Sequence, residues 1–199
     1  HKSTISMTMA PINGVNIGDH PLVKRLMRGV FKERPSRRAN PAPWDPLKVF
    51  AIFQQWPVEL PLSKLIRKGV FLMSLATAKR ASELAALLCD DTHFRREGEN
   101  LRFVPSRLTK TDRPGHLTPP FYVKPWKDDS CVCPVETVRL IMEERDRLRL
   151  QHSALFFSWT SPHQPLDAAA LGRCIDYCLV KAGIRAAPGS TRSVAASAA

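Results

Sequence analysis

The sequence predicts a mainly α-helical protein with one small antiparallel β-hairpin. Most of its long segments carry apolar residues at helical spacing, at i, i+3 and i+4. Only two short runs, 101–105 and 117–123, have the composition of strands, and turn-forming residues separate them. The length of 199 residues fits one large or two small domains.

Residues 1–35 are predicted to contain a helical segment followed by a basic helix. Asp19 is the predicted N-cap of a helix that has Pro21 in its first turn. Residues 36–46 form a basic, proline-rich linker, which is expected to be extended. Residues 47–199 are the predicted second domain.

Basic side chains dominate the end of the first domain and the linker. The stretch from Lys24 to Arg38 contains seven basic residues and one acidic residue, Glu33. It could be a solvated helix face followed by a soluble linker. We favour a surface that follows the phosphates of duplex DNA, because charges of one sign repel each other unless a polyanion neutralises them. The candidate DNA-binding residues are Lys24, Arg25, Arg28, Lys32, Arg34, Arg37 and Arg38.

The second domain is predicted to contain the hairpin and six helices, the last of which begins at Ser190. Prolines in both strand candidates favour edge strands, and the turn at 112–115 places Lys110 near the tip of the hairpin. Asp167 is the expected N-cap of the final long helix, and Gly183 its C-terminal stop. The other predicted helices cover 47–53, 62–76, 82–88, 134–148 and 167–183.

Composition narrows the class of partner. The net charge of +12 and the pI of about 10.0 indicate a polyanion, either nucleic acid or an anionic membrane surface. No apolar run approaches the roughly 18 residues that span a bilayer. The five cysteines have no disulfide or zinc spacing, and Cys174 and Cys178 share the apolar face of a helix. We therefore expect no metal site.

Three cations stand at the junctions of predicted elements: Arg80, Lys110 and Arg192. Arg80 follows a buried helix, and Glu83 lies one helical turn after it. The simple interpretation is an exposed Arg80–Glu83 ion pair. The functional one is that the three cations converge on one phosphate, where guanidinium forks bind the non-bridging oxygens.

The motifs around these cations resemble those of the tyrosine recombinase (phage-integrase) family. Ala76–Leu84 (ATAKRASEL) resembles the family's first-arginine box, A-T-G-x-R-x-S-E-L, and Leu108–Thr111 (LTKT) resembles its hairpin lysine motif. Gly189–Arg192 falls where the family has H-x-x-R. The segments Ser190–Ser197 and His20–Val23 are especially similar to recombinases of DIRS-type retrotransposons.

The resemblance implies a clamp around duplex DNA. Residues 1–35 would be the last part of a helical core-binding (DNA-binding) domain, and residues 47–199 would be a catalytic domain that needs no metal and no cofactor. A tyrosine would attack the scissile phosphodiester and form a 3′-phosphotyrosyl link. Arg80 and Arg192 would bind the non-bridging oxygens, Lys110 would protonate the leaving 5′ oxygen, and Glu83 would support the site. It also implies a tetramer on DNA and a nuclear location.

Two departures from the family pattern leave the activity open. Gly189 replaces the family histidine, and glycine cannot supply the hydrogen bond of an imidazole. Tyr122 and Tyr177 do not occupy the family's nucleophile position, so we expect a fragment that is inactive by itself. The alternatives are a remnant that only binds DNA and an unrelated basic helical module.

Overall fold

The computed structural model describes residues 6–34, 44–108 and 112–184. The chain divides into two compact units, His1–Asn40 and Pro41–Ala199, and each is described by itself. Within the described residues no helix is both long and apolar enough to cross a membrane.

The first unit is built around one amphipathic helix, α2 (Pro21–Glu33), which follows the short 3-10 helix η1 (Ile17–Asp19). His20, not Asp19, is the N-cap of α2, because its Nδ1 accepts a hydrogen bond from the Leu22 N–H at 3.3 Å. The predicted cap was therefore wrong by one residue. Asp19 instead lies 3.2 Å from the Lys24 ammonium.

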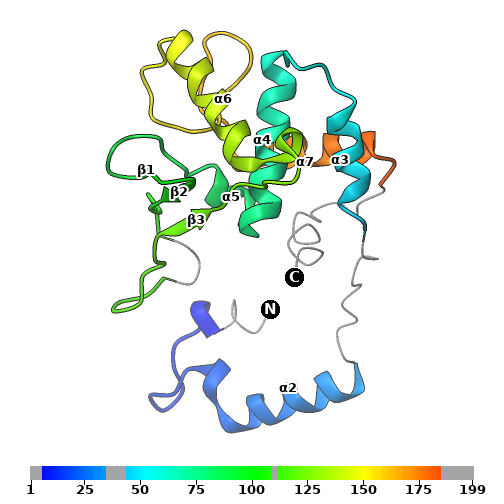
Figure 1. Ribbon diagram of the computed structural model, residues 1–199. Helices are drawn as coiled ribbons and strands as arrows, with labels where there is room; N and C mark the ends of the chain where they lie inside the picture. The colour runs from blue at the N-terminus through cyan, green and yellow to red at the C-terminus, as the bar shows by residue number, and fades with distance from the viewer. Residues whose placement is uncertain (1–5, 35–43, 109–111, 185–199) are drawn as a thin grey trace. The chain divides into compact units, whose positions relative to one another are not determined.

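The second unit is mainly helical, with α4 (Leu62–Thr77) at its centre (Figure 1). Helix α4 packs against α6 (Pro134–Arg147) and α7 (Ala168–Lys181). Helix α3 (Leu47–Gln54) contacts α7 and the 3-10 helix η2 (Ser130–Val132). The short α5 (Ala81–Leu84) contacts both α4 and α7, and it replaces the longer helix predicted over 82–88.

The middle of α4 is buried at residues 65–66 and 68–74, because α5, α6, α7 and β3 all contact this helix. Gly69 allows α6 to approach closely, since a Cβ there would lie 2.4 Å from Ile141 Cδ1. The apolar run therefore forms the central core of the unit, as the sequence indicates.

A three-stranded antiparallel sheet covers one end of the helices. The strands β1 (Phe94–Glu97), β2 (Asn100–Phe103) and β3 (Phe121–Val123) lie in the order β1-β2-β3. The pairing of β2 with β3 agrees with the predicted hairpin, but β1 was not predicted. The prediction of an edge position was wrong for β2, which is the central strand. Pro105 lies two residues beyond the end of β2, outside its hydrogen-bond ladder.

Helix α7 begins and ends at the predicted signals. The Asp167 side chain accepts a hydrogen bond from the Ala170 N–H at 2.7 Å, and Gly183 follows the helix with a φ of 70°. Cys174 and Cys178 are buried on its core face, as the helical spacing predicts. The apolar segment 154–157, which lies between α6 and α7 in the sequence, is also buried but belongs to no named strand.

Candidate functional site

A pocket of about 290 Å³ lies where α5 meets the loop that follows β2. The residues that line it come from three segments that are distant in sequence: the start of α5, the loop after β2, and β3. They are Lys79, Arg80, Ser82, Glu83, Ala86, Leu87, Pro105, Ser106, Arg107, Leu108 and Phe121. Residues of the Ala76–Leu84 segment and of the loop that begins after β2 therefore line one pocket.

A sharp chain reversal after α4 positions Arg80. Helix α4 ends at Ala78, which is in the left-handed conformation with a φ of 53°. The Thr77 hydroxyl donates to the Met73 carbonyl at 2.6 Å, and it accepts from the Lys79 N–H at 3.4 Å. Arg80 is then the extended N-cap residue of α5. These contacts fix the backbone on which the arginine stands.

Glu83 holds Arg80 at two points. One carboxylate oxygen accepts the Arg80 backbone N–H at 2.8 Å, and the other lies 3.4 Å from Nη1 of the guanidinium. The Arg80 side chain is 46% exposed, whereas that of Glu83 is 21% exposed. The predicted i, i+3 ion pair is thus present. It engages one edge of the guanidinium, and the exposed part of the fork borders the pocket.

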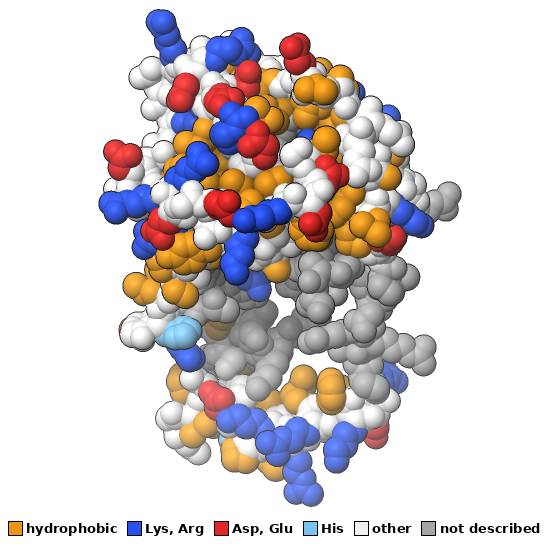
Figure 2. All heavy atoms as spheres, viewed as in Figure 1, with side chains coloured by type: hydrophobic (Ala, Val, Ile, Leu, Met, Phe, Trp, Pro, Cys, Tyr) orange, Lys and Arg blue, Asp and Glu red, His pale blue; other side chains and the backbone are white. Residues whose placement is uncertain are grey.

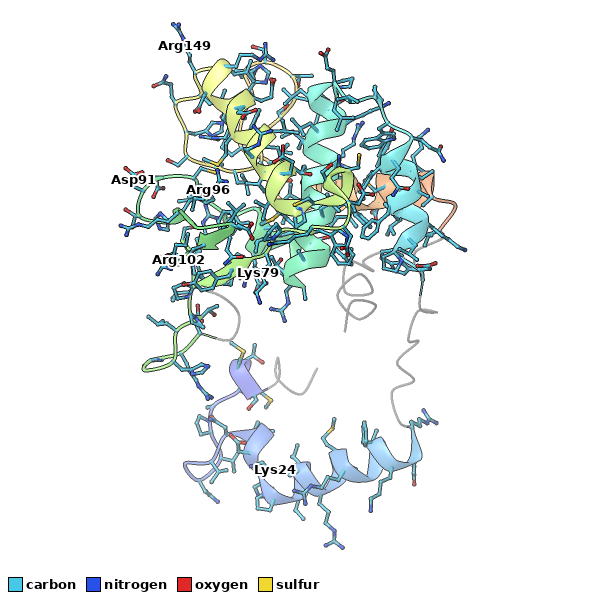
Figure 3. The ribbon with its side chains drawn as sticks, viewed as in Figure 1. Lys24, Lys79, Asp91, Arg96, Arg102 and Arg149 are labelled. Carbon is cyan, nitrogen blue, oxygen red and sulfur yellow. The ribbon has the colours of Figure 1, made fainter. Side chains whose placement is uncertain are left out.

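Two further cations line the same pocket. The Lys79 ammonium lies 4.2 Å from the centre of the Phe121 ring, a cation–π contact that ties the end of α4 to β3 (Figure 3). Arg107 is exposed in the loop after β2. The Ser106 hydroxyl donates to the Ala86 carbonyl at 2.5 Å, which holds that loop against the end of α5. With three cations and one carboxylate, the lining favours an anion.

Lys79 lies inside the Ala76–Leu84 motif and Arg107 directly precedes the Leu108–Thr111 motif, but neither was predicted to have a role. Phe121 was assigned only to a strand. Their meeting at one pocket depends on the pairing of β2 with β3, which local sequence patterns do not encode. The one sequence signal for the two extra cations is that Lys79 adjoins Arg80 and that Arg107 lies three positions before Lys110.

The structure does not test convergence of the three predicted cations. Arg80 and Glu83 are described and lie together, whereas Lys110, Gly189 and Arg192 lie outside the described residues. Leu108, which lines the pocket, precedes Lys110 by two positions in the sequence.

Helix α2 carries four of the predicted DNA-binding residues on one face. Lys24, Arg25, Arg28 and Lys32 line one shallow surface hollow, and Figure 2 shows basic side chains gathered along this helix. Arg34 is its C-cap residue, and Arg37 and Arg38 lie outside the described residues. Met27 and Phe31 also line this hollow, and the apolar residues Leu22, Leu26 and Val30 are exposed as well within the described residues.

Neither tyrosine lines the pocket. Tyr177 packs in the helical layer, where the Arg67 guanidinium carbon lies 4.1 Å from its ring and 4.6 Å from that of Trp159. Tyr122 is half exposed on β3. Across the described ranges, no three His, Cys, Asp or Glu side chains form a group that could hold a metal ion.

Comparison with known proteins adds no family to this geometry. No protein-family model matches the sequence, and no curated protein and no solved structure shows significant similarity to it.

Proposed function

We propose that this protein binds duplex DNA and that the pocket at Arg80 holds a backbone phosphate. The observation that carries the proposal is the exposed Arg80 fork, which Glu83 orients while Lys79 and Arg107 line the same pocket. Arginine forks match the geometry of two phosphate oxygens, so charge-assisted hydrogen bonds favour this ligand.

The resemblance of the motifs to tyrosine recombinases extends this proposal to DNA breakage and rejoining. In that reaction a tyrosine oxygen bonds to phosphorus, and the bond to the 5′ oxygen breaks. Arg80 and Arg192 would stabilise the charge on the non-bridging oxygens. Lys110 would donate a proton to the leaving 5′ oxygen. The order of the motifs and the placement of Arg80 beside the loop that leads to Lys110 support these roles.

The basic face of α2 would supply a second part of the DNA contact. Lys24, Arg25, Arg28 and Lys32 project from one side of a helix, and α2 ends at Glu33 with Arg34 after it. Phosphate contacts of this kind position a protein without reading sequence. A fall in affinity with salt therefore measures them directly.

A second candidate function is DNA binding without strand cleavage. Gly189, in place of the family histidine, favours it, because glycine has no side chain to hydrogen-bond the phosphate. The two functions differ in one assay. Relaxation of supercoiled plasmid by the full-length protein would support recombinase chemistry. Tight DNA binding without relaxation would support the binding-only function.

A salt titration of duplex DNA affinity tests the binding itself. Each neutralised phosphate contributes about −0.9 to the slope of log K against log salt concentration. We expect a slope of several negative units for the 199-residue chain. A flat response would contradict the proposal.

A further inference from the structure

The outer face of the sheet carries a cross-strand row of two arginines and a tyrosine. Arg102 of β2 is paired with Arg95 of β1 on one side and with Tyr122 of β3 on the other. Neighbouring strands lie about 5 Å apart, so these three side chains stand side by side. We refer to Arg95, Arg102 and Tyr122 as the sheet row.

The alternation of side chains along each strand determines which face of the sheet carries the sheet row. Phe94, Phe103 and Phe121 form the adjacent row, and their rings pack at centroid distances of 5.0 and 5.5 Å. Phe103 is fully buried, so that adjacent row faces the core. Successive side chains point to opposite faces, and the sheet row therefore faces solvent.

The charges on this face favour an anionic partner. Like charges directly opposite one another on neighbouring strands are destabilising, which applies to Arg95 and Arg102. Glu97 lies 3.6 Å from Arg102 Nε and offsets part of that charge. Arg95 makes a long contact, 3.5 Å from its Nε to the Asp91 carbonyl oxygen. Figure 3 marks Arg102, and also Arg96, which lines a separate groove with α6.

The exposed tyrosine indicates a partner that offers more than negative charge. Tyr122 is 51% exposed, so one part of its ring is open to solvent beside a guanidinium. Aromatic rings next to arginines on a sheet face stack on unpaired nucleobases while the arginines contact the backbone. In a duplex the base faces are covered by their neighbours, which leaves nothing for the ring to stack on.

We propose that the sheet row binds a single-stranded segment of nucleic acid, with one base stacked on Tyr122 and backbone phosphates on Arg95 and Arg102. The proposal concerns a surface separate from the Arg80 pocket. It does not depend on the phosphate chemistry proposed there.

The test compares a fluorescent single-stranded oligothymidylate with a duplex of random sequence, at fixed salt, for three variants. Tyr122→Ala should weaken single-strand binding at least about fivefold and leave duplex binding unchanged. Tyr122→Phe keeps the ring and should bind like the wild type. Arg95→Gln should lower the single-strand salt slope by about 0.7. Thermal unfolding of each variant checks the fold.

Three results would overturn the proposal. They are unchanged single-strand affinity of Tyr122→Ala, equal losses for single strand and duplex, and a loss for Tyr122→Phe as large as for Tyr122→Ala. An Arg80→Ala control separates this failure from failure of the proposed function, because Arg80 should affect duplex binding alone. Suppose that Arg80→Ala weakens duplex binding while Tyr122→Ala leaves single-strand binding unchanged. That result would support the phosphate pocket and contradict the role proposed for the sheet row.

Discussion

The Glu83 carboxylate accepts the backbone N–H of Arg80 at 2.8 Å and also lies 3.4 Å from its guanidinium. One side chain thus caps the start of α5 and orients the fork that lines the pocket. This is half of a capping box, because a guanidinium has no acceptor with which to reciprocate. The local helix start and the candidate site share the same carboxylate.

This double contact predicts different effects for two substitutions of Glu83. Glu83→Gln keeps an oxygen that can accept the Arg80 N–H, and it should cost a few tenths of a kcal/mol. Glu83→Ala loses the cap and should cost about 1 kcal/mol. Urea unfolding measures both. Equal destabilisation by the two variants would show that charge, not the cap, is the important contact. Glu83→Gln should also bind duplex DNA at least as tightly as the wild type, because it removes a negative charge from the pocket.

The left-handed residue at the end of α4 predicts a stabilising substitution. Ala78 has a φ of 53°, a region in which a Cβ is unfavourable and glycine is not. Ala78→Gly should therefore raise the free energy of unfolding by about 1 kcal/mol. The matched control is Ala76→Gly inside α4, where the same chemical change should cost about 1 kcal/mol. A destabilised Ala78→Gly variant would contradict the backbone geometry before Arg80.

The cysteines should differ in reactivity. Burial raises the pKa of the Cys89 thiol to about 12, and it also raises the pKa values of Cys174 and Cys178. The thiolate is the reactive form, so a raised pKa leaves little of it at pH 8. Cys131 is exposed.

Iodoacetamide at pH 8 should therefore modify Cys131 first, and Cys89, Cys174 and Cys178 only after denaturant is added. Peptide mass spectrometry measures the order. Modification of Cys89 at the rate of Cys131 in the folded protein would contradict the burial of that thiol.

The sequence predicts the helical part of the fold well because its signals are local. Apolar spacing marks α4, α6 and α7, and Asp167 and Gly183 mark the two ends of α7. The strand β1 escaped prediction because Arg95, Arg96 and Glu97 make it look like a charged loop. Only its pairing with β2 places the partly buried Phe94 against the core.

The candidate site shows the same division between local and long-range information. Glu83 is one helical turn from Arg80, so their contact could be predicted from spacing. Arg107 and Phe121 reach the pocket through the pairing of β2 with β3, which joins segments almost twenty positions apart. No periodicity in the chain indicates that arrangement.

The most direct test of the phosphate pocket is the duplex DNA affinity of Arg80→Ala, measured across a salt series beside Arg173→Ala. Arg173 is exposed on α7 and lies outside the pocket, so both variants lose one positive charge. A charged hydrogen bond to phosphate is worth about 1.5–3 kcal/mol, or roughly tenfold or more in affinity.

We predict at least about a tenfold loss for Arg80→Ala, a salt slope reduced by about 0.9, and affinity within about twofold of the wild type for Arg173→Ala. Equal small losses in both variants would mean that Arg80 contributes only to the overall charge, and the phosphate pocket would be contradicted.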